Sequence, residues 1–151
     1  MMNRFGMAAA ALVLAASAAG GASAADHKVQ MKTQGSAGGI MVFEPSFLAV
    51  EPGDTVTFEA TDPGHNAQSI DGMLPAGAQP FAGKLNETVT VTLTQPGVYG
   101  YECTPHYAMG MVGVVVVGPK PPANLAQAQA VEHPARAKAV FDDLLKQAAQ
   151  P

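Results

Sequence analysis

Apolar and polar side chains alternate along several short segments of the chain. Residues 55–60 place Val56, Phe58 and Ala60 on one face, and residues 88–94 repeat this alternation. A period of two in segments rich in Thr and Val is typical of half-buried antiparallel strands. Further apolar segments with the character of strands are residues 29–31, 40–43, 47–50, 98–103 and 111–117.

Turn-forming residues separate these segments. Gly-Gly or Pro-Gly pairs occur at positions 38–39, 52–53, 63–64 and 96–97. Such pairs favour tight turns, because Gly accepts positive φ and Pro fixes φ in advance. Roughly seven or eight short strands at this spacing predict an all-β protein with a Greek-key β-sandwich. Residues 72–83, which are richer in Gly, Pro and Ala, are predicted to form a loop.

The pattern changes after Pro119. Residues 123–131 are rich in Ala and Gln, which favour helix. A second helix is predicted near Pro134, which suits a first helical turn, and it carries an apolar stripe at helical spacing. The residues of this stripe are Ala137, Val140, Phe141, Leu144, Leu145 and Ala148. Since the stripe needs a partner surface, we expect a two-helix C-terminal extension packed on the sandwich.

The first residues have the pattern of an export signal. Arg4 gives a positive start, residues 7–16 are continuously apolar, and Ala22-Ser23-Ala24 is a small-residue cleavage site. The apolar stretch is too short to span a bilayer as a stable helix. We therefore predict a cleaved signal peptide at residues 1–24, a single domain at 25–119 and its helical extension at 120–151.

The charge of the chain argues against nucleic-acid binding. The whole chain has a formal charge of -4, and removal of residues 1–24 makes it more acidic because Arg4 is the only charged side chain there. Between Ala25 and Pro119 the only basic side chains are Lys28, Lys32 and Lys84. Such a chain lacks the basic surface that nucleic-acid binding requires.

The single cysteine lies among residues that bind metals. Cys103 is followed by His106 and by two methionines, Met109 and Met111, and His65 lies beside Asn66 further upstream. Taken alone, a lone cysteine in an exported chain indicates a buried inert thiol or an intermolecular disulfide. Its neighbours favour another interpretation. Two imidazoles, one thiolate and a weak thioether are the ligands of a blue-copper electron-transfer site.

These residues resemble those of the cupredoxins, and among them the pseudoazurins. The Cys-x2-His-x4-Met spacing that begins at Cys103 is shared with plastocyanins. Three further stretches and the two-helix extension narrow the resemblance to the pseudoazurins. The stretches are residues 41–45 (Met-Val-Phe-Glu-Pro), residues 64–66 (Gly-His-Asn) with Ser69-Ile70, and residues 103–111. The resemblance covers essentially the whole mature chain. It implies a cupredoxin fold with one copper ion held by His65, Cys103, His106 and, as axial ligand, Met111.

Three residues near this ligand set each have two possible interpretations. Met109 is a rival axial ligand, although the family pattern favours Met111 and leaves Met109 on the apolar surface around His106. Asn66 is interpreted as a bridge between the two ligand loops, and otherwise as a good turn residue. By the same resemblance Met41 would lie near the imidazole of His106, although the pattern alone makes it ordinary core.

The resemblance also implies a function and its partners. It indicates a periplasmic carrier of single electrons, not an enzyme, that docks redox proteins through an apolar rim around His106, commonly a nitrite reductase. This chain has Pro63 and Glu102 where family members have lysine. In residues 80–84, Lys84 is the only lysine that remains. We therefore expect a weakly charged or mildly acidic docking face and a less acidic partner, such as a c-type cytochrome.

Alternatives follow from the same residues. A copper oxidase or nitrite reductase needs further histidine-rich centres, and the chain has too few histidines to build one. A periplasmic copper storage or delivery protein also uses soft ligands, although it needs an open, exchangeable site. The remaining histidines, His27 and His133, are expected at solvated surface positions. We expect a monomer, because the mature chain shows no obvious stripe for self-association.

Overall fold

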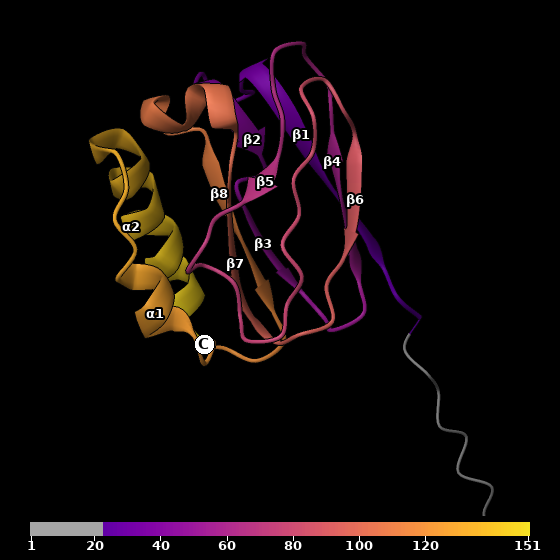
Figure 1. Cartoon of the computed structure of the whole chain (residues 1–151), viewed down its shortest axis with the longest axis vertical. Helices are drawn as coiled ribbons and strands as arrows, with labels where there is room; N and C mark the ends of the chain where they lie inside the picture. The colour runs from indigo at the N-terminus through magenta and orange to yellow at the C-terminus, as the bar shows by residue number, and fades with distance from the viewer. Residues whose placement is uncertain (1–22) are drawn as a thin grey trace, which may run out of the picture.

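The computed structural model describes residues 23–151, which form a sandwich of two four-stranded sheets flanked by helices (Figure 1). One sheet has the strand order β2-β1-β4-β6, and the other has the order β3-β8-β7-β5. The strands of the first are β1 (Asp26–Gln34), β2 (Ile40–Glu44), β4 (Thr55–Glu59) and β6 (Val89–Thr92). Those of the second are β3 (Phe47–Val50), β5 (Gln68–Ser69), β7 (Gly97–Glu102) and β8 (Val112–Val117).

The fold class predicted from the alternation is confirmed, but the pairing is mixed. β1 pairs with β4 in parallel and β3 pairs with β8 in parallel, whereas the other pairs are antiparallel. The antiparallel pairing expected for residues 55–60 and 88–94 is found between β4 and β6, whereas β4 pairs with β1 in parallel. Alternation reports which face of a strand is buried, and it carries no information on the direction of the neighbouring strand.

The core between the sheets is built on three aromatic rings. The ring of Tyr101 lies 4.8 Å from the ring centroids of both Phe43 and Phe58, in edge-to-face contacts. Gly113 on β8 makes room for Tyr101, since a Cβ atom at this position would lie 2.2 Å from its ring. The site-bearing end of β7 is thus fixed by a rigid, close-packed core.

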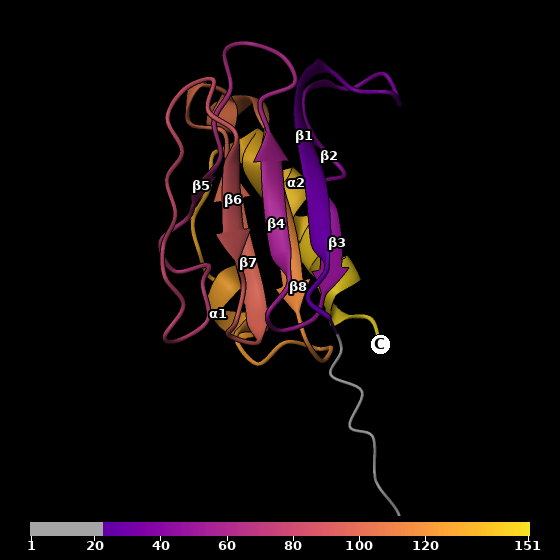
Figure 2. The same cartoon turned by 90° about the vertical axis from the view of Figure 1, so that its right-hand side faces the viewer.

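The helices cover the outer face of the second sheet (Figure 2). They are α1 (Leu125–Gln129) and α2 (Ala135–Ala149), and a 3₁₀ segment, η1 (Thr104–Met109), links β7 to β8. Every residue of β8 is buried, because Val115 and Val117 face the core while Val112, Val114 and Val116 face the cluster that contains α2. The predicted apolar stripe is confirmed, with Val140 only half-buried.

The boundaries of the helices differ from those expected. α1 is shorter than residues 123–131, and Pro134 is the cap that precedes α2. Residues 72–83 form a loop as predicted, with an isolated bridge between Gln68 and Ala82. Among residues 23–151, no helix combines the length and apolar character needed to cross a membrane. The predicted signal peptide falls almost wholly outside the described residues and stays a prediction, as do the domain boundaries.

Candidate metal centre

Three of the predicted ligands meet at one end of the sandwich. Donor atoms of His65, Cys103 and His106 all lie within 4.8 Å of one another. The Sγ atom of Cys103 is 3.4 Å from Nδ1 of His106 and 3.7 Å from Nδ1 of His65, and the two Nδ1 atoms are 3.1 Å apart. Donors from two distant segments therefore face a single point.

The segment between β7 and β8 is held at both ends by its own backbone. The amide of Cys103 donates to the carbonyl of Met111 at 3.0 Å, and the amide of Met111 donates to the carbonyl of His106 at 3.2 Å. Pro105 lies in the first turn of η1, and Gly110 caps its end with a φ of 90°, a left-handed conformation that glycine adopts without strain. These contacts fix Cys103, His106 and Met111 in one short loop.

His65 comes from the segment between β4 and β5 and is oriented from its other side. Its Nε2 atom lies 3.1 Å from Oγ1 of Thr33 on β1, which leaves Nδ1 facing Cys103. Asn86 secures the backbone, since its amide donates to the carbonyl of His65 and its Oδ1 accepts from the amide of Gly64. An outer partner of this kind sets the tautomer and the direction of a ligating imidazole. Sequence reasoning did not predict the roles of Thr33 and Asn86.

Asn66 bridges the two ligand segments, as the sequence analysis proposed. Its Oδ1 accepts from the amide of Thr104 at 2.8 Å, and its Nδ2 donates to Oγ1 of Thr104 at 3.1 Å. The same Nδ2 donates to the carbonyl of Gly83 at 3.1 Å. This buried side chain therefore ties the residue after Cys103 to the residue after His65.

Burial shapes the protonation of the site. Burial raises the pKa of the Cys103 thiol, and the backbone N–H groups of Asn66 and His106 oppose this effect. Burial also lowers the pKa of His65, with a smaller contribution from the nearby His106. Neutral imidazoles are competent metal ligands, and a buried thiolate needs a compensating positive charge. The donor set and its burial fit one soft-to-borderline cation such as copper.

The two methionines of the loop have different environments. Met111 is fully buried and belongs to the same core cluster as Cys103, whereas the side chain of Met109 is 40% exposed. Met41 is half-buried and packs against that core cluster. These positions agree with an axial role for Met111 and a surface role for Met109.

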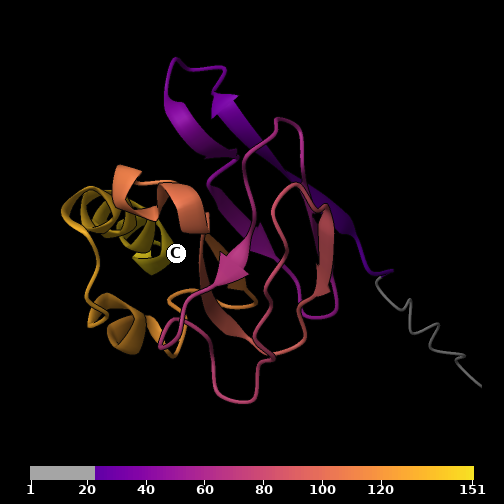
Figure 3. The same cartoon turned by 45° about the horizontal axis from the view of Figure 1, so that its top comes forward.

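Apolar side chains lie beside the half-buried His106 on η1. Pro105, Ala108 and Met109 are exposed beside it on η1. The other exposed large hydrophobic side chains among the described residues are Ile40, which begins β2, and Leu85, which precedes β6. Figure 3 brings this end of the sandwich forward and shows η1 beside α2.

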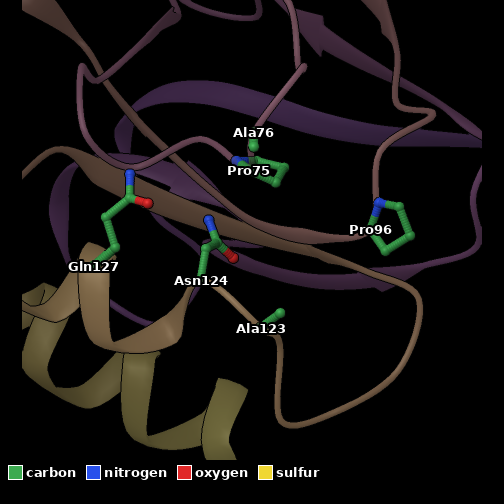
Figure 4. A pocket seen from close by; sticks show the side chains of 6 residues that line it. All are labelled: Pro75, Ala76, Pro96, Ala123, Asn124 and Gln127. Atoms are coloured by element: carbon green, nitrogen blue, oxygen red, sulfur yellow. The ribbon is translucent and has the colours of Figure 1, made fainter.

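A hollow of about 370 Å³ lies away from the metal centre (Figure 4). Its lining includes Pro75, Pro96 and Asn124, and Pro96 precedes β7 whereas Cys103 follows that strand. Asn124 uses its amide group on the backbone of Val98, accepting at 2.7 Å and donating at 3.0 Å. The hollow is therefore the outer surface of a structural joint between α1 and the sheet.

His133 is not at a solvated surface position, so that expectation was wrong. Its Nδ1 atom lies 2.6 Å from the hydroxyl of Tyr107, and its ring centroid lies 4.4 Å from that of Phe141. Its Nε2 atom is buried and has no hydrogen-bond partner among the described residues. Burial lowers the pKa of His133. The imidazole of His133 packs on the apolar stripe of α2, and its hydrogen bond with Tyr107 links η1 to the helical extension. His27 is partly exposed, as expected, although it is bonded to Asp54.

We expect Tyr107→Phe to lower the free energy of unfolding by about 1 kcal/mol, the value of one hydrogen bond with a partly buried partner. Chemical denaturation of the copper-free protein measures this loss. Tyr99→Phe is the control, because its hydroxyl donates to the carbonyl of Gln95 far from η1. A Tyr107→Phe variant as stable as the parent would show that the contact with His133 contributes nothing.

Comparisons with known proteins agree with this geometry. Residues 29–118 match the family model described as copper binding proteins of the plastocyanin/azurin family. A pseudoazurin of Paracoccus pantotrophus is 47% identical over 97% of this chain and 99% of its own length, and one of Methylorubrum extorquens is 40% identical over 97% and 98%. A solved pseudoazurin structure from Sinorhizobium is 43% identical and covers 82% of this chain and 95% of its own, with a TM-score of 0.78.

The fold and the converging donors define a copper-binding cupredoxin. The chain belongs to the pseudoazurin family. It is a type 1 copper electron-transfer protein rather than an enzyme, and it exchanges electrons with redox partner proteins. The alternative of copper storage or delivery finds no support among these relatives.

Proposed function

We propose that His65, Cys103, His106 and Met111 hold the single copper ion and that electrons enter and leave through His106. The main observation in support is that three donors converge in one site. Of these three residues only His106 is partly exposed, and its neighbours on η1 are apolar. Copper bound there supplies a one-electron couple. His65, Cys103 and Met111 are buried, so the imidazole of His106 is the shortest link from the donors to a docked partner.

The chain's own residues keep the site rigid. Thr33 orients His65, Asn66 ties together the two ligand segments, and the closed η1 loop fixes Cys103 and His106. Burial of the sulfur atoms excludes water from them. Since little can rearrange between oxidation states, the reorganisation that slows electron transfer is kept small.

The partner would dock on the apolar rim of Pro105, Ala108 and Met109 around His106. Small, weakly held interfaces suit a carrier, because turnover requires rapid release. A chemical-shift map of the reduced, copper-loaded protein with a candidate partner tests this. Shifts concentrated on η1 and around Ile40 and Leu85 support the proposal, and shifts confined to α2 contradict it.

The charge pattern favours a partner that is weakly charged or basic. Lys28 pairs with Glu59 and Lys32 pairs with Glu44, while Glu102 lies directly before the ligand Cys103. A c-type cytochrome with a basic docking face fits this surface better than an acidic nitrite reductase.

We expect the rate with a basic c-type cytochrome to fall by up to about tenfold between low and physiological salt, because screening shortens the range of attraction from about 30 Å at 0.01 M to about 10 Å at 0.1 M. With an acidic nitrite reductase the rate stays level or rises. Stopped-flow kinetics at increasing ionic strength measures both. A steep fall with the acidic reductase would contradict the proposed charge of the docking face.

We further propose that the protein is exported to the periplasm and that its signal peptide is cleaved after Ala24. The mature protein is proposed to be a monomer. The pattern of Arg4, an apolar stretch and Ala22-Ser23-Ala24 supports this processing. Mass spectrometry of the protein recovered from the periplasm tests the cleavage, with Ala25 expected as the first residue. A chain that stays uncleaved in the cytoplasm would overturn it.

A further inference from the structure

Cleavage after Ala24 would create an unusual N-terminus, Ala25-Asp26-His27. A free α-amine with histidine in third place presents four nitrogens in sequence: the amine, two backbone amides and the imidazole Nδ1. These nitrogens can close fused chelate rings around one ion in a plane. Square-planar nitrogen coordination is selective for Cu(II) and Ni(II).

We propose that the processed N-terminus is a second metal site, which takes Cu(II) or Ni(II) through the α-amine of Ala25, the amide nitrogens of Asp26 and His27, and Nδ1 of His27. This inference rests on the proposed cleavage and is independent of the ligands assigned to the type 1 site. It adds a site of different chemistry, because no thiolate takes part.

In the paired strand, the carboxylate of Asp54 already holds the imidazole of His27 in the tautomer that the chelate needs. Its Oδ2 atom lies 2.9 Å from Nε2 of His27 and also accepts from the amide of Glu51, and its Oδ1 accepts from the backbone nitrogen of Ala25 at 2.8 Å. An acceptor surrounded by donors places the ring proton on Nε2. In that tautomer the lone pair is on Nδ1, the atom that closes the chelate. A carboxylate behind the ligating imidazole is a common supporting contact in metal sites.

The terminus is accessible and distant from the type 1 site. Ala25 and Asp26 are exposed and His27 is partly exposed. β2 pairs with β1 only from Gln30 onwards, so within residues 23–151 one edge of the start of β1 has no neighbouring strand. Thr33, which contacts His65, lies at the other end of β1, roughly 20 Å along an extended strand. Figure 1 shows the start of β1 at the end of the sandwich opposite η1.

Closing the chelate requires only a short stretch to leave the sheet. The pairs Asp26↔Thr55 and His27↔Val56 open, as does the hydrogen bond from the amide of Thr55 to the carbonyl of Ala25. The bond from the nitrogen of Ala25 to Asp54 and those from the hydroxyls of Thr55 and Thr57 to Asp26 open with them. Terminal residues of a strand open more readily than the core of the sheet. Binding of the ion releases one proton from the α-ammonium and one from each amide. Occupancy therefore falls as the pH is lowered.

The test uses the copper-loaded mature chain beginning at Ala25, titrated with further Cu(II) and followed by electron paramagnetic resonance. We expect a second equivalent with the wide hyperfine splitting of square-planar copper and nitrogen couplings, beside an unchanged type 1 signal. Two matched controls alter the terminus alone. His27→Gln removes the imidazole, and a chain that retains Ala24 moves histidine to fourth place. Each should weaken the second site by at least about a hundredfold. His27→Gln removes one of the four donor nitrogens, and the retained Ala24 changes the sizes of the chelate rings.

Equal binding of the second equivalent by either control would overturn the proposal, as would its absence from the parent chain. Mature protein that begins at a residue other than Ala25 would also overturn it. Failure of the proposed type 1 ligand set is distinguishable, because that failure changes the visible spectrum of the parent and of both controls alike. A titration with Ni(II) gives an independent readout, since square-planar Ni(II) is diamagnetic and adds nothing to the paramagnetic resonance of the type 1 copper.

Discussion

Cys103→Ser is expected to abolish the intense thiolate-to-copper absorption of the protein. The sulfur of Cys103 is the only thiol in the chain, and it lies 3.4 Å and 3.7 Å from the Nδ1 atoms of His106 and His65. A hydroxyl in its place cannot supply the soft, anionic ligand that the band requires. Visible absorption of the copper-loaded variant measures the effect.

The control substitutions separate the thiol from the methionines. Met109→Leu should leave the absorption and the reduction potential unchanged, because the side chain is partly exposed. Met111→Leu should retain a blue colour but shift the potential, because the axial ligand tunes it. Circular dichroism of the copper-free Cys103→Ser protein checks that the sandwich is intact. A blue Cys103→Ser variant would contradict the proposed ligand set.

The local part of the site could be predicted from the sequence. Cys103, His106 and Met111 lie in one loop between two apolar segments, so their proximity follows from chain length alone. His65 required more, since its approach to Cys103 depends on how two distant loops meet at one end of the sandwich. The spacing motif and the family resemblance supplied this information, and the geometry of the three donors agrees with it.

The supporting contacts could not be predicted. Thr33 reaches His65 because β1 runs in parallel beside β4, and the parallel direction is invisible in a pattern with a period of two. Asn86 adopts a positive φ of 64° and reaches the backbone of Gly64 and His65 through a loop without periodicity. Such contacts depend on the path of the chain in three dimensions, whereas hydrophobic patterns report only burial.

His133 shows a related limit. Its position beside Pro134, before a helix, indicates a solvated cap, yet the ring lies on Phe141 and its Nδ1 meets the hydroxyl of Tyr107. An amphipathic residue at the edge of an apolar stripe is drawn inward when a neighbouring element offers a hydrogen-bond partner. Here η1 supplies that partner. The extension therefore does more than cover β8, because it also contacts the loop that carries the ligands.

Asn66→Ala should disturb both the stability of the protein and its copper site. The buried side chain makes hydrogen bonds to Thr104 and to the carbonyl of Gly83, so its loss leaves buried polar groups without partners. We expect the free energy of unfolding of the copper-free protein to fall by about 2–4 kcal/mol. The visible band and the reduction potential of the copper-loaded protein should also shift, because the loop that carries Cys103 is no longer tied to His65.

Asn124→Ala is the matched control. Asn124 also bridges backbone groups across the fold, with bonds of 2.7 Å and 3.0 Å to Val98, but it lies at the joint between α1 and β7. Its loss should lower the free energy of unfolding by about 1–3 kcal/mol and leave the spectrum and potential of the copper site unchanged. If both variants lose stability and neither alters the copper site, Asn66 acts only as a structural bridge. If Asn66→Ala alone alters the site, the side chain sets the geometry in which Cys103 and His65 share one ion.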